Sequence, residues 1–333
     1  MKRSWTLAAA TSALLLATAC SGSSDVTGSD DEASTGASSA EGFPATVSTA
    51  FGDVTIEEEP VRVVALGWGD AETALSLGTQ PVGASDWLGF GGEGVGPWMD
   101  GQYDEAPVII ETLEPSYEEI AALEPDLILD TKSSGEQERY DRLSSIAPTV
   151  GVPEGGESYL TTTEQQVDLV AEALGQPTAG DDLLADLEAE FASQAEAHPE
   201  WDGLSVAAAT KTSEGWGAYV AGSSRVQFLT DLGFVQSEEI AALEPNEGGF
   251  SVDISSERLD LIDSDLIVAF PIFIETTEIT EDPLWQEVPA VADGHSVVID
   301  GDLSSAYSLG TVAATKYALN ELVPMIEDAT AGQ

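Results

Sequence analysis

The chain contains few of the residues from which most catalytic and metal-binding sites are built. Its 333 residues include two histidines, one cysteine and ten Lys or Arg residues against 61 Asp or Glu residues, and the formal net charge is −51 at pH 7. A single cysteine excludes an internal disulfide, so the fold must be held by its core. The histidines, His198 and His295, are too isolated to predict a metal site. Nucleic acid and anionic lipid are excluded as partners because this negative charge repels them.

Sequence motifs of catalysis are also missing. The chain has no G-x-S-x-G nucleophile elbow and no GK[ST] phosphate loop. The glycines of Gly89–Gly94 have the spacing of a dinucleotide-binding turn, but no strand pattern precedes them and no helical pattern follows. Paired carboxylates are not informative at this composition, because acids lie near one another by chance. A secreted polysaccharide-acting enzyme therefore remains an alternative, which turnover of substrate would distinguish from a binding protein.

No apolar run is long enough to span a membrane. Residues 5–19 are apolar, follow Lys2 and Arg3, and end in small residues, which is typical of a secretory signal peptide and shorter than the roughly 18 residues of a span. The segment Leu16–Cys20 resembles a bacterial lipoprotein signal, in which the cysteine receives lipid and becomes the first residue. Ordinary cleavage after Ala19 is the alternative. We expect a signal peptide at 1–19 and a lipid anchor on Cys20.

The segment after the cysteine is rich in Ser, Gly, Ala and Asp and has no periodic apolar pattern. Such a composition cannot bury enough apolar surface to fold, so residues 20–43 are predicted to form a disordered tether. The globular part therefore begins at about residue 44.

Two similar stretches indicate two lobes of similar plan. Ser116–Leu129 and Ser255–Val268 share the pattern S-x-E-x-[IL]-x-x-[LI]-x-x-D-L-I-[LV], which predicts a helix followed by a buried parallel strand. Further upstream, Arg62–Leu66 and Leu204–Thr210 each predict a buried strand followed by a loop that contains tryptophan. The fold class is therefore α/β, with two Rossmann-like lobes and a ligand cleft between them.

A single long helix is predicted to join the lobes. In Asp181–Trp201 the residues Leu183, Leu184, Leu187 and Phe191 fall on one helical face, and Pro199 stops the helix. The predicted division is a first lobe at 44–177, a connecting helix at 178–200 and a second lobe at 201–333.

In this order and spacing the segments resemble a known family. The motifs are Pro60–Val64, Leu77–Gly83, Ser116–Glu118, Pro125–Ile128, Leu232–Gly233, Leu284–Trp285 and Ala290–Val291. They resemble the bacterial iron-siderophore and cobalamin solute-binding lipoproteins, whose lobes are bridged by one long helix and which feed an ABC transporter. The resemblance implies a monomeric, lipid-anchored protein on the outer face of the cell membrane that has no catalytic activity and no cofactor.

Candidate ligand contacts follow the predicted strands, because ligands of open α/β sheets bind beyond the carboxyl ends of the strands. Aromatic and cationic residues gather at these places, although each aromatic has a core role as its alternative. The candidates are Trp68, Trp87, Trp98, Tyr103, Lys132, Trp216, Tyr219, Arg225, Phe273 and Tyr307. Lys132 and Arg225 are expected to reach the metal-binding oxygens from opposite lobes, with surface ion pairs as the alternative, and no residue is expected to bind metal directly.

The scarcity of cations bears on the ligand. A ferric tris-catecholate carries about three negative charges and calls for an Arg cluster, whereas a neutral or cationic ferric hydroxamate suits an aromatic cleft with one or two donors. A hydroxamate-type iron(III)–siderophore is therefore favoured, and cobalamin or haem is the alternative.

Glu118 and Glu257 occupy equivalent positions in the two similar stretches. The resemblance implies that one surface glutamate of each lobe docks onto arginines of the permease subunits. The alternative is that both acids only stabilise helix N-termini through the helix dipole.

Overall fold

The computed structural model describes residues 42–156, 158–246 and 249–332 of the chain. The predicted signal peptide, Cys20 and nearly all of the predicted tether lie outside these residues. The described residues belong to one compact unit. Within them, no helix combines the length and apolar character that crossing a membrane requires. The predicted boundaries at 177/178 and 200/201 serve below to name the first and second lobes.

The first lobe is built on a five-stranded parallel sheet of order β5-β4-β3-β6-β7. Its central strands Val63–Ala65 and Leu127–Leu129 are buried on both faces, as a parallel sheet with helices on each side requires. A separate hairpin, β1–β2, precedes the sheet. The elements are β1 Ala45–Thr49, β2 Gly52–Ile56, β3 Val63–Ala65, α1 Asp70–Ser76, β4 Gly83–Ser85, η1 Pro97–Met99, β5 Val108–Ile110, α2 Tyr117–Ala122, β6 Leu127–Leu129, α3 Gln137–Ser144, β7 Thr149–Val150 and α4 Thr163–Ala173.

The second lobe is built on a mixed sheet of order β11-β9-β8-β12-β13, with β10 also paired to β8. Strands β8, β10, β12 and β13 are parallel, whereas β9 pairs antiparallel with both β8 and β11. The elements are β8 Ser205–Thr212, β9 Gly215–Tyr219, α6 Ser224–Asp231, β10 Val235–Gln236, α7 Glu238–Ala241, β11 Ser251–Ile254, η3 Ser256–Ile262, β12 Leu266–Pro271, α8 Thr277–Thr280, α9 Pro283–Gln286, α10 Pro289–Ala292, β13 Ser296–Val298, α11 Gly301–Leu309 and α12 Val312–Thr330.

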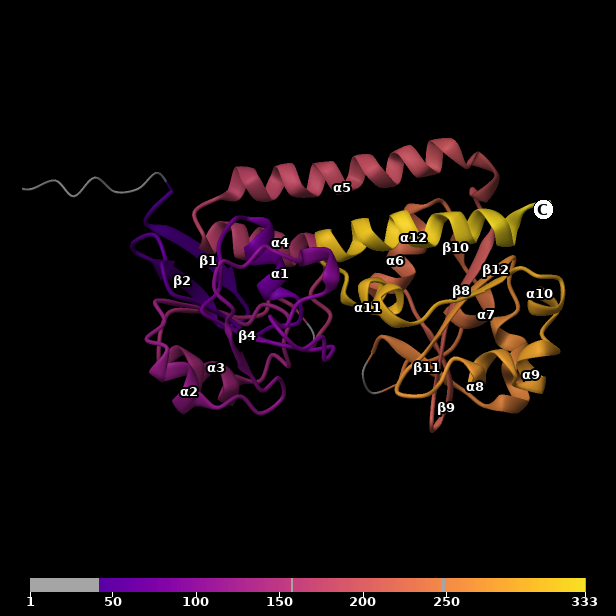
Figure 1. Cartoon of the computed structure of the whole chain (residues 1–333), viewed down its shortest axis with the longest axis horizontal. Helices are drawn as coiled ribbons and strands as arrows, with labels where there is room; N and C mark the ends of the chain where they lie inside the picture. Colours follow the sequence, from indigo (N-terminus) through magenta and orange to yellow (C-terminus); the bar gives the residue numbers. More distant parts are fainter. Residues whose placement is uncertain (1–41, 157, 247–248, 333) are drawn as a thin grey trace, which may run out of the picture. The chain divides into compact units, whose positions relative to one another are not determined.

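The long helix between the lobes is α5, Pro177–Ala197, which is followed by the short helix η2, Pro199–Trp201 (Figure 1). Proline suits the first position of a helix because its fixed φ is helical and its missing N–H has no partner there. Helix α5 packs against α4, α6 and α12. A Cβ on Gly180 would lie 2.6 Å from the Cβ of Ala171, so glycine at this position allows α4 and α5 to approach closely.

The two similar stretches form a helix and a strand, but the helices differ in kind. The first stretch forms α2 and β6, and Ser116 caps α2 by accepting a hydrogen bond from the backbone of Glu119. In the second stretch the helix is the 3-10 helix η3, with non-helical backbone angles at Arg258, followed by β12. Both stretches therefore have the predicted order of a helix followed by a strand.

Candidate functional site

The strand order of the first lobe locates a site. From β3, the chain adds β4 and β5 on one side of the sheet and then β6 and β7 on the other, so the strand order reverses between β3 and β6. Open α/β sheets bind ligands at such a switch point, outside the carboxyl ends of the strands. Residues 66–69 follow β3 and residues 130–133 follow β6. The predicted residues Trp68 and Lys132 therefore lie in the two loops that border this switch point.

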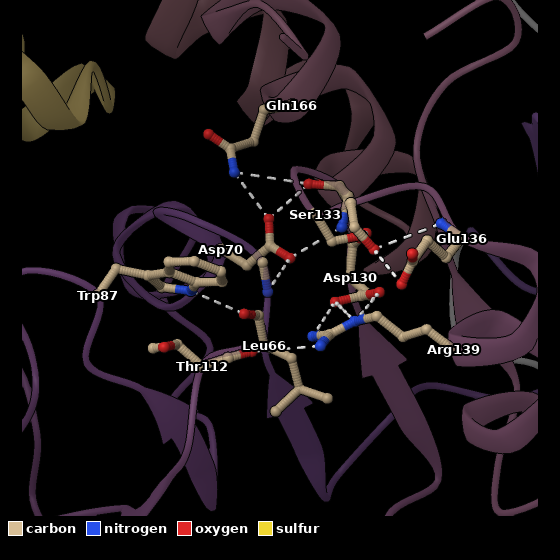
Figure 2. A network of polar contacts seen from close by, with 12 residues as sticks. Leu66, Asp70, Trp87, Thr112, Asp130, Ser133, Glu136, Arg139 and Gln166 are labelled. Atoms are coloured by element: carbon tan, nitrogen blue, oxygen red, sulfur yellow. Dashed lines mark hydrogen bonds and ion pairs between the residues drawn. The ribbon is translucent and has the colours of Figure 1, made fainter. Parts of the chain in front are cut away.

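A buried carboxylate joins these two loops (Figure 2). Oδ2 of Asp70 accepts hydrogen bonds from the backbone N–H groups of Gly67 (3.0 Å) and Thr131 (2.9 Å), and Oδ1 accepts from Nε2 of Gln166 (2.7 Å). Burial raises the pKa of Asp70, while the hydrogen bonds from Thr131 and Gln166 act in the opposite direction. Glycine is required at Gly67, because a Cβ there would strike Asp70 and lie 2.9 Å from the backbone N of Lys132.

A buried ion pair between Arg139 and Asp130 fixes the start of the loop after β6. Nη2 of Arg139 donates to Oδ1 of Asp130 at 2.8 Å, Nε donates to Oδ2 at 2.9 Å, and Nη1 donates to the carbonyl of Thr112 (Figure 2). Both side chains are buried, so this bidentate ion pair fixes the end of β6. It also leaves Arg139 without a free donor edge for a ligand.

Aromatic side chains form a wall beside the switch point. The ring centroids of Trp68 and Trp87 are 5.6 Å apart, and those of Trp87 and Tyr159 are 5.5 Å apart. Trp87 donates from Nε1 to the carbonyl of Leu66 at 2.8 Å, which fixes its ring over the end of β3 (Figure 2). Tyr159 was missed from the sequence; its backbone has φ 57°, which is uncommon for a non-glycine residue, and is a mark of functional segments.

Lys132 has an unusual environment. Only 7% of the residue is exposed, and its ammonium makes no hydrogen bond or ion pair within the described part of the chain. Its pKa is lowered to about 8, chiefly by burial and further by the positive charge of Arg225, while the negative charge of Asp70 acts in the opposite direction. Lys132 is thus a buried cation whose charged form is disfavoured by burial and by the positive charge of Arg225.

Arg225 of the second lobe is held by aromatic rings. Its guanidinium lies 4.3 Å from the ring centroid of Tyr219 and 5.8 Å from that of Phe270. Nε of Arg225 is buried and has no hydrogen-bond partner among the described residues. The hydroxyl of Tyr307 donates to the carbonyl of Arg225 at 2.8 Å. Tyr307 is 2% exposed, so the structure corrects its predicted role from a ligand contact to a support for Arg225.

Strand β9 separates two predicted contacts. Successive side chains of a strand point to opposite faces, so Trp216 packs with Ala218 in one core and Tyr219 packs in the other. Trp216 is 3% exposed, stacks on Trp285 at 5.3 Å and donates to Asp282. Direct contact between a ligand and Trp216 does not fit this placement, and the sequence reading was misled because it took the Gly-rich stretch around Trp216 for a loop.

Phe273, directly after β12, has the opposite character. Its side chain is fully exposed (103%), and its backbone has φ 56°, which is strained for an aromatic residue. An exposed aromatic side chain on a strained backbone has no packing explanation, and ligand contacts are a common reason for such a feature.

The Gly-rich segment after β4 turns back toward the second lobe. Asp86 orders it by accepting backbone hydrogen bonds from Gly89, Phe90 and Gly91. A cavity of about 900 Å³ lies between this segment and the first turn of α11. Its charged lining residues are Glu93, Asp100 and Asp302.

The two other predicted contacts of this segment lie beside α1 rather than at the switch point. Trp98 donates from Nε1 to Oε2 of Glu72 at 2.9 Å and packs on Tyr317 of α12 at 5.2 Å. Tyr103 is buried against Leu75 and Met99, so its predicted ligand contact is corrected to a packing role. Burial raises the pKa of Tyr103.

A short seam connects the lobes between α11 and α12. Nε1 of Trp68 donates to the carbonyl of Leu309 at 3.2 Å, and the hydroxyl of Thr163 donates to the carbonyl of Gly310 at 2.6 Å. The hydroxyl of Thr311 donates to Oε2 of the buried Glu72 at 2.6 Å. Helix α5 is therefore not the only contact between the lobes.

The two predicted docking glutamates are exposed. Glu118 lies in the first turn of α2, and Glu257 lies in the first turn of η3. No cluster of three or more His, Cys, Asp or Glu side chains that would suit a metal ion occurs in the described residues.

The sequence and fold can now be compared with those of known proteins. The family model for periplasmic binding proteins matches residues 63–303. The chain belongs to this family. Its members bind solutes and are not enzymes, so the alternative of a polysaccharide-acting enzyme is set aside.

Among curated proteins, a probable siderophore-binding lipoprotein of Bacillus subtilis, YfiY, is 27% identical over 302 residues, which cover 83% of this chain and 86% of the relative. Among solved structures, PiaA of Streptococcus pneumoniae in complex with ferrichrome aligns with a TM-score of 0.72 at 27% identity, covering 86% of this chain and 98% of PiaA. A solute-binding protein of Mycobacterium smegmatis aligns with a TM-score of 0.76 at 24% identity, covering 86% and 99% of the two chains, which shows the shared fold. These matches agree with the predicted two-lobed α/β class.

Proposed function

We propose that the chain is the solute-binding component of an ABC importer, and that it captures a ferric siderophore outside the cytoplasm and delivers it to the permease. The single observation that carries this proposal is the pairing of Lys132 and Arg225. Each lobe contributes one cation without a hydrogen bond or ion pair among the described residues. Lys132 lies in a loop bonded to the backbone of the half-buried Trp68, and Arg225 lies over the buried rings of Tyr219 and Phe270. Oxygen atoms around a bound iron are well matched to such donors.

Similarity to known proteins supports the same ligand class. The relative YfiY is named for siderophore binding, and PiaA is solved with ferrichrome, a ferric hydroxamate. A hydroxamate-type siderophore is therefore the first candidate. The contact set that we propose is Trp68, Trp87, Lys132, Tyr159, Arg225 and Phe273.

Fluorescence titration tests this proposal, because Trp68 and Trp87 lie in the site. We expect saturable quenching, with a Kd of about 1 µM or below, by a ferrioxamine-like ferric hydroxamate, and weaker quenching by the iron-free compound. Ferric catecholates, cobalamin and haem serve as competing ligands. Tighter binding of a catecholate would exclude the hydroxamate choice, and binding of cobalamin or haem without any ferric siderophore would exclude the proposal.

Docking onto the permease is proposed to use Glu118 and Glu257, one from each lobe. Charge-assisted hydrogen bonds from arginines of a two-fold permease would fix the orientation of the loaded protein. Replacing both residues by Ala should leave ligand binding unchanged and abolish uptake. The matched control replaces the exposed Glu58 and Glu287, one from each lobe, and should transport normally. Normal uptake by the E118A/E257A protein would exclude a docking role and leave stabilisation of the helix N-termini as the role of the two residues.

The anchor is proposed to be a lipid on Cys20, with the protein acting as a monomer on the outer face of the cell membrane. The name of the relative YfiY, a lipoprotein, supports this. The full-length protein should fractionate with membranes, and Cys20→Ala should release it in soluble form. A membrane-bound Cys20→Ala protein would contradict the anchor.

A further inference from the structure

Lys132 and Arg225 stand apart from the other cations of the chain. The structure describes eight of the ten Lys and Arg residues. Four of them form ion pairs with carboxylates: Arg139, Lys211, Arg258 and Lys316. Two exposed ones have other partners, since Arg62 donates to the carbonyls of Leu123 and Glu124 and Arg142 stacks on Tyr117. Among the described residues of this acidic chain, Lys132 and Arg225 are the two cations that are not exposed and have no hydrogen bond or ion pair from their charged groups.

A short chain of contacts places these two residues on either side of the seam between the lobes. The backbone N–H of Trp68 donates to the carbonyl of Lys132 at 2.9 Å, and the Trp68 ring donates to the carbonyl of Leu309. Two residues earlier in α11, Tyr307 donates to the carbonyl of Arg225. The backbone of Lys132, through Trp68, and the backbone of Arg225, directly, are thus linked to neighbouring residues of α11.

No carboxylate near Lys132 is free to neutralise it. The acid whose charge acts on Lys132 is Asp70, and its two oxygens already accept from Gly67, Thr131 and Gln166. Asp70 also lies beyond ion-pair distance of Lys132, since no ion pair joins them. A buried ammonium beside a guanidinium is unfavourable unless an anion arrives between them.

We infer that the ligand carries a carboxylate that lies between Lys132 and Arg225. This inference rests on the proposed function and specifies the ligand further. The ligand is a ferric complex that carries a carboxylate group, rather than a neutral complex without one. Arginine is suited to this role because its planar donors match both oxygens of a carboxylate. Lysine supplies a point charge from the other side.

The charges around the site favour one carboxylate over a larger negative charge. A ferric tris-catecholate brings about three negative charges, and two cations leave part of that charge uncompensated. Glu93, Asp100 and Asp302 line the cavity between the Gly-rich segment and α11, and their charge disfavours a ligand with a large net negative charge. A complex with a single carboxylate arm matches the two cations best.

Three ligands with one ferric trihydroxamate core test the inference. Ferrioxamine B ends in an ammonium, its N-acetyl derivative is neutral there, and its N-succinyl derivative ends in a carboxylate. We expect the succinyl complex to bind at least about tenfold more tightly than the acetyl complex. The salt concentration is kept fixed because salt screens the charges of this acidic chain.

Variants assign the preference to the two cations. Lys132→Met and Arg225→Gln should each reduce the preference for the succinyl complex, and the double variant should bind the acetyl and succinyl complexes alike. Lys316→Met and Arg258→Gln change the net charge equally, at cations paired with Glu190 and Asp260, and should keep the full preference.

The outcomes separate the two proposals. Equal binding of the acetyl and succinyl complexes, or tightest binding of a catecholate, would overturn the carboxylate inference and leave siderophore capture intact. Failure of every ferric complex to bind would overturn both. A preference that persists in the double variant would also overturn the inference, because the carboxylate would then be recognised elsewhere.

Discussion

In the first lobe a buried polar network positions the loop that carries Lys132, whereas in the second lobe aromatic rings contact the side chain of Arg225. Asp70 ties the loops after β3 and β6 together through directional hydrogen bonds, and these bonds have no replacement if the carboxylate is lost. Tyr219 and Phe270 support Arg225 through ring faces, which tolerate small displacements. Single substitutions in the polar network of the first lobe should therefore cost more free energy of unfolding than single substitutions around Arg225 in the second lobe.

The largest expected effect comes from Asp70→Ala. This change leaves the buried N–H groups of Gly67 and Thr131 and the amide of Gln166 without their acceptor, so the free energy of unfolding should fall by about 2 to 4 kcal/mol. Urea unfolding measures the loss. As a control, Asp126→Ala also removes an acceptor of two backbone N–H groups, those of Val61 and Arg62, at a solvent-exposed site. A similar cost for both variants would contradict a special role of the buried network.

The next effect has the opposite sign. Burial lowers the pKa of Lys132 in the folded state from its ordinary value of 10.5 to about 8. Below pH 8 both states are protonated and the buried charge destabilises the fold by up to about 3 kcal/mol. Between pH 8 and 10.5 the folded state loses its proton first, so this destabilisation shrinks as pH rises. Lys132→Met should therefore be more stable than the natural protein by about 1 to 3 kcal/mol at pH 7, and by less at pH 10, in denaturant titrations.

Lys316→Met is the matched control for this prediction. Lys316 pairs with Glu190 on the surface, so its removal should change stability by less than about 1 kcal/mol and without the same pH dependence. Destabilisation by Lys132→Met at pH 7 would show that the ammonium already has a partner in the empty protein.

A smaller effect is expected for Tyr307→Phe in the second lobe. The variant removes the hydrogen bond to the carbonyl of Arg225 but keeps the ring contacts with Phe228 and Phe270. Stability should fall by about 1 kcal/mol in thermal unfolding. A loss as large as that of Asp70→Ala would remove the distinction between the two lobes.

The smallest effect on stability is expected for Phe273→Ala. The side chain is fully exposed, so unfolding should change by less than about 0.5 kcal/mol. Ligand affinity should nevertheless fall several-fold if the ring stacks on the ligand. Phe273→Gly should be slightly more stable than Phe273→Ala, because glycine adopts the positive φ without strain. Unchanged affinity in both variants would exclude Phe273 from the site.

The sequence patterns predicted the elements that border the site better than the contacts within it. Strands β3, β6, β8 and β12 follow continuous aliphatic runs, and helix α5 follows an apolar stripe that ends near Pro199. These signals are local, so they can be read without the fold. They also placed Lys132 and Phe273 just after strand ends, where the structure has them.

The remaining features depend on contacts between distant parts of the chain. Gln166 donates a hydrogen bond to Asp70, which is 96 positions away in the sequence, and Tyr307 donates to Arg225, which is 82 positions away. No spacing in the sequence predicts such pairs. The antiparallel strand β9 was missed because glycines interrupt its alternating pattern, and Trp216 was therefore assigned to a loop.

The seam at Leu309, Gly310 and Thr311 limits how the empty protein fluctuates. Separating the lobes there breaks three hydrogen bonds, at about 1 kcal/mol each, and would leave on the order of one molecule in a hundred open at any moment. A ligand that bound only to this minor population would show an apparent affinity about a hundredfold weaker than its intrinsic one. Tight capture therefore requires a site that is accessible while the seam stays intact, and the residence time of the ligand is then set by its own contacts.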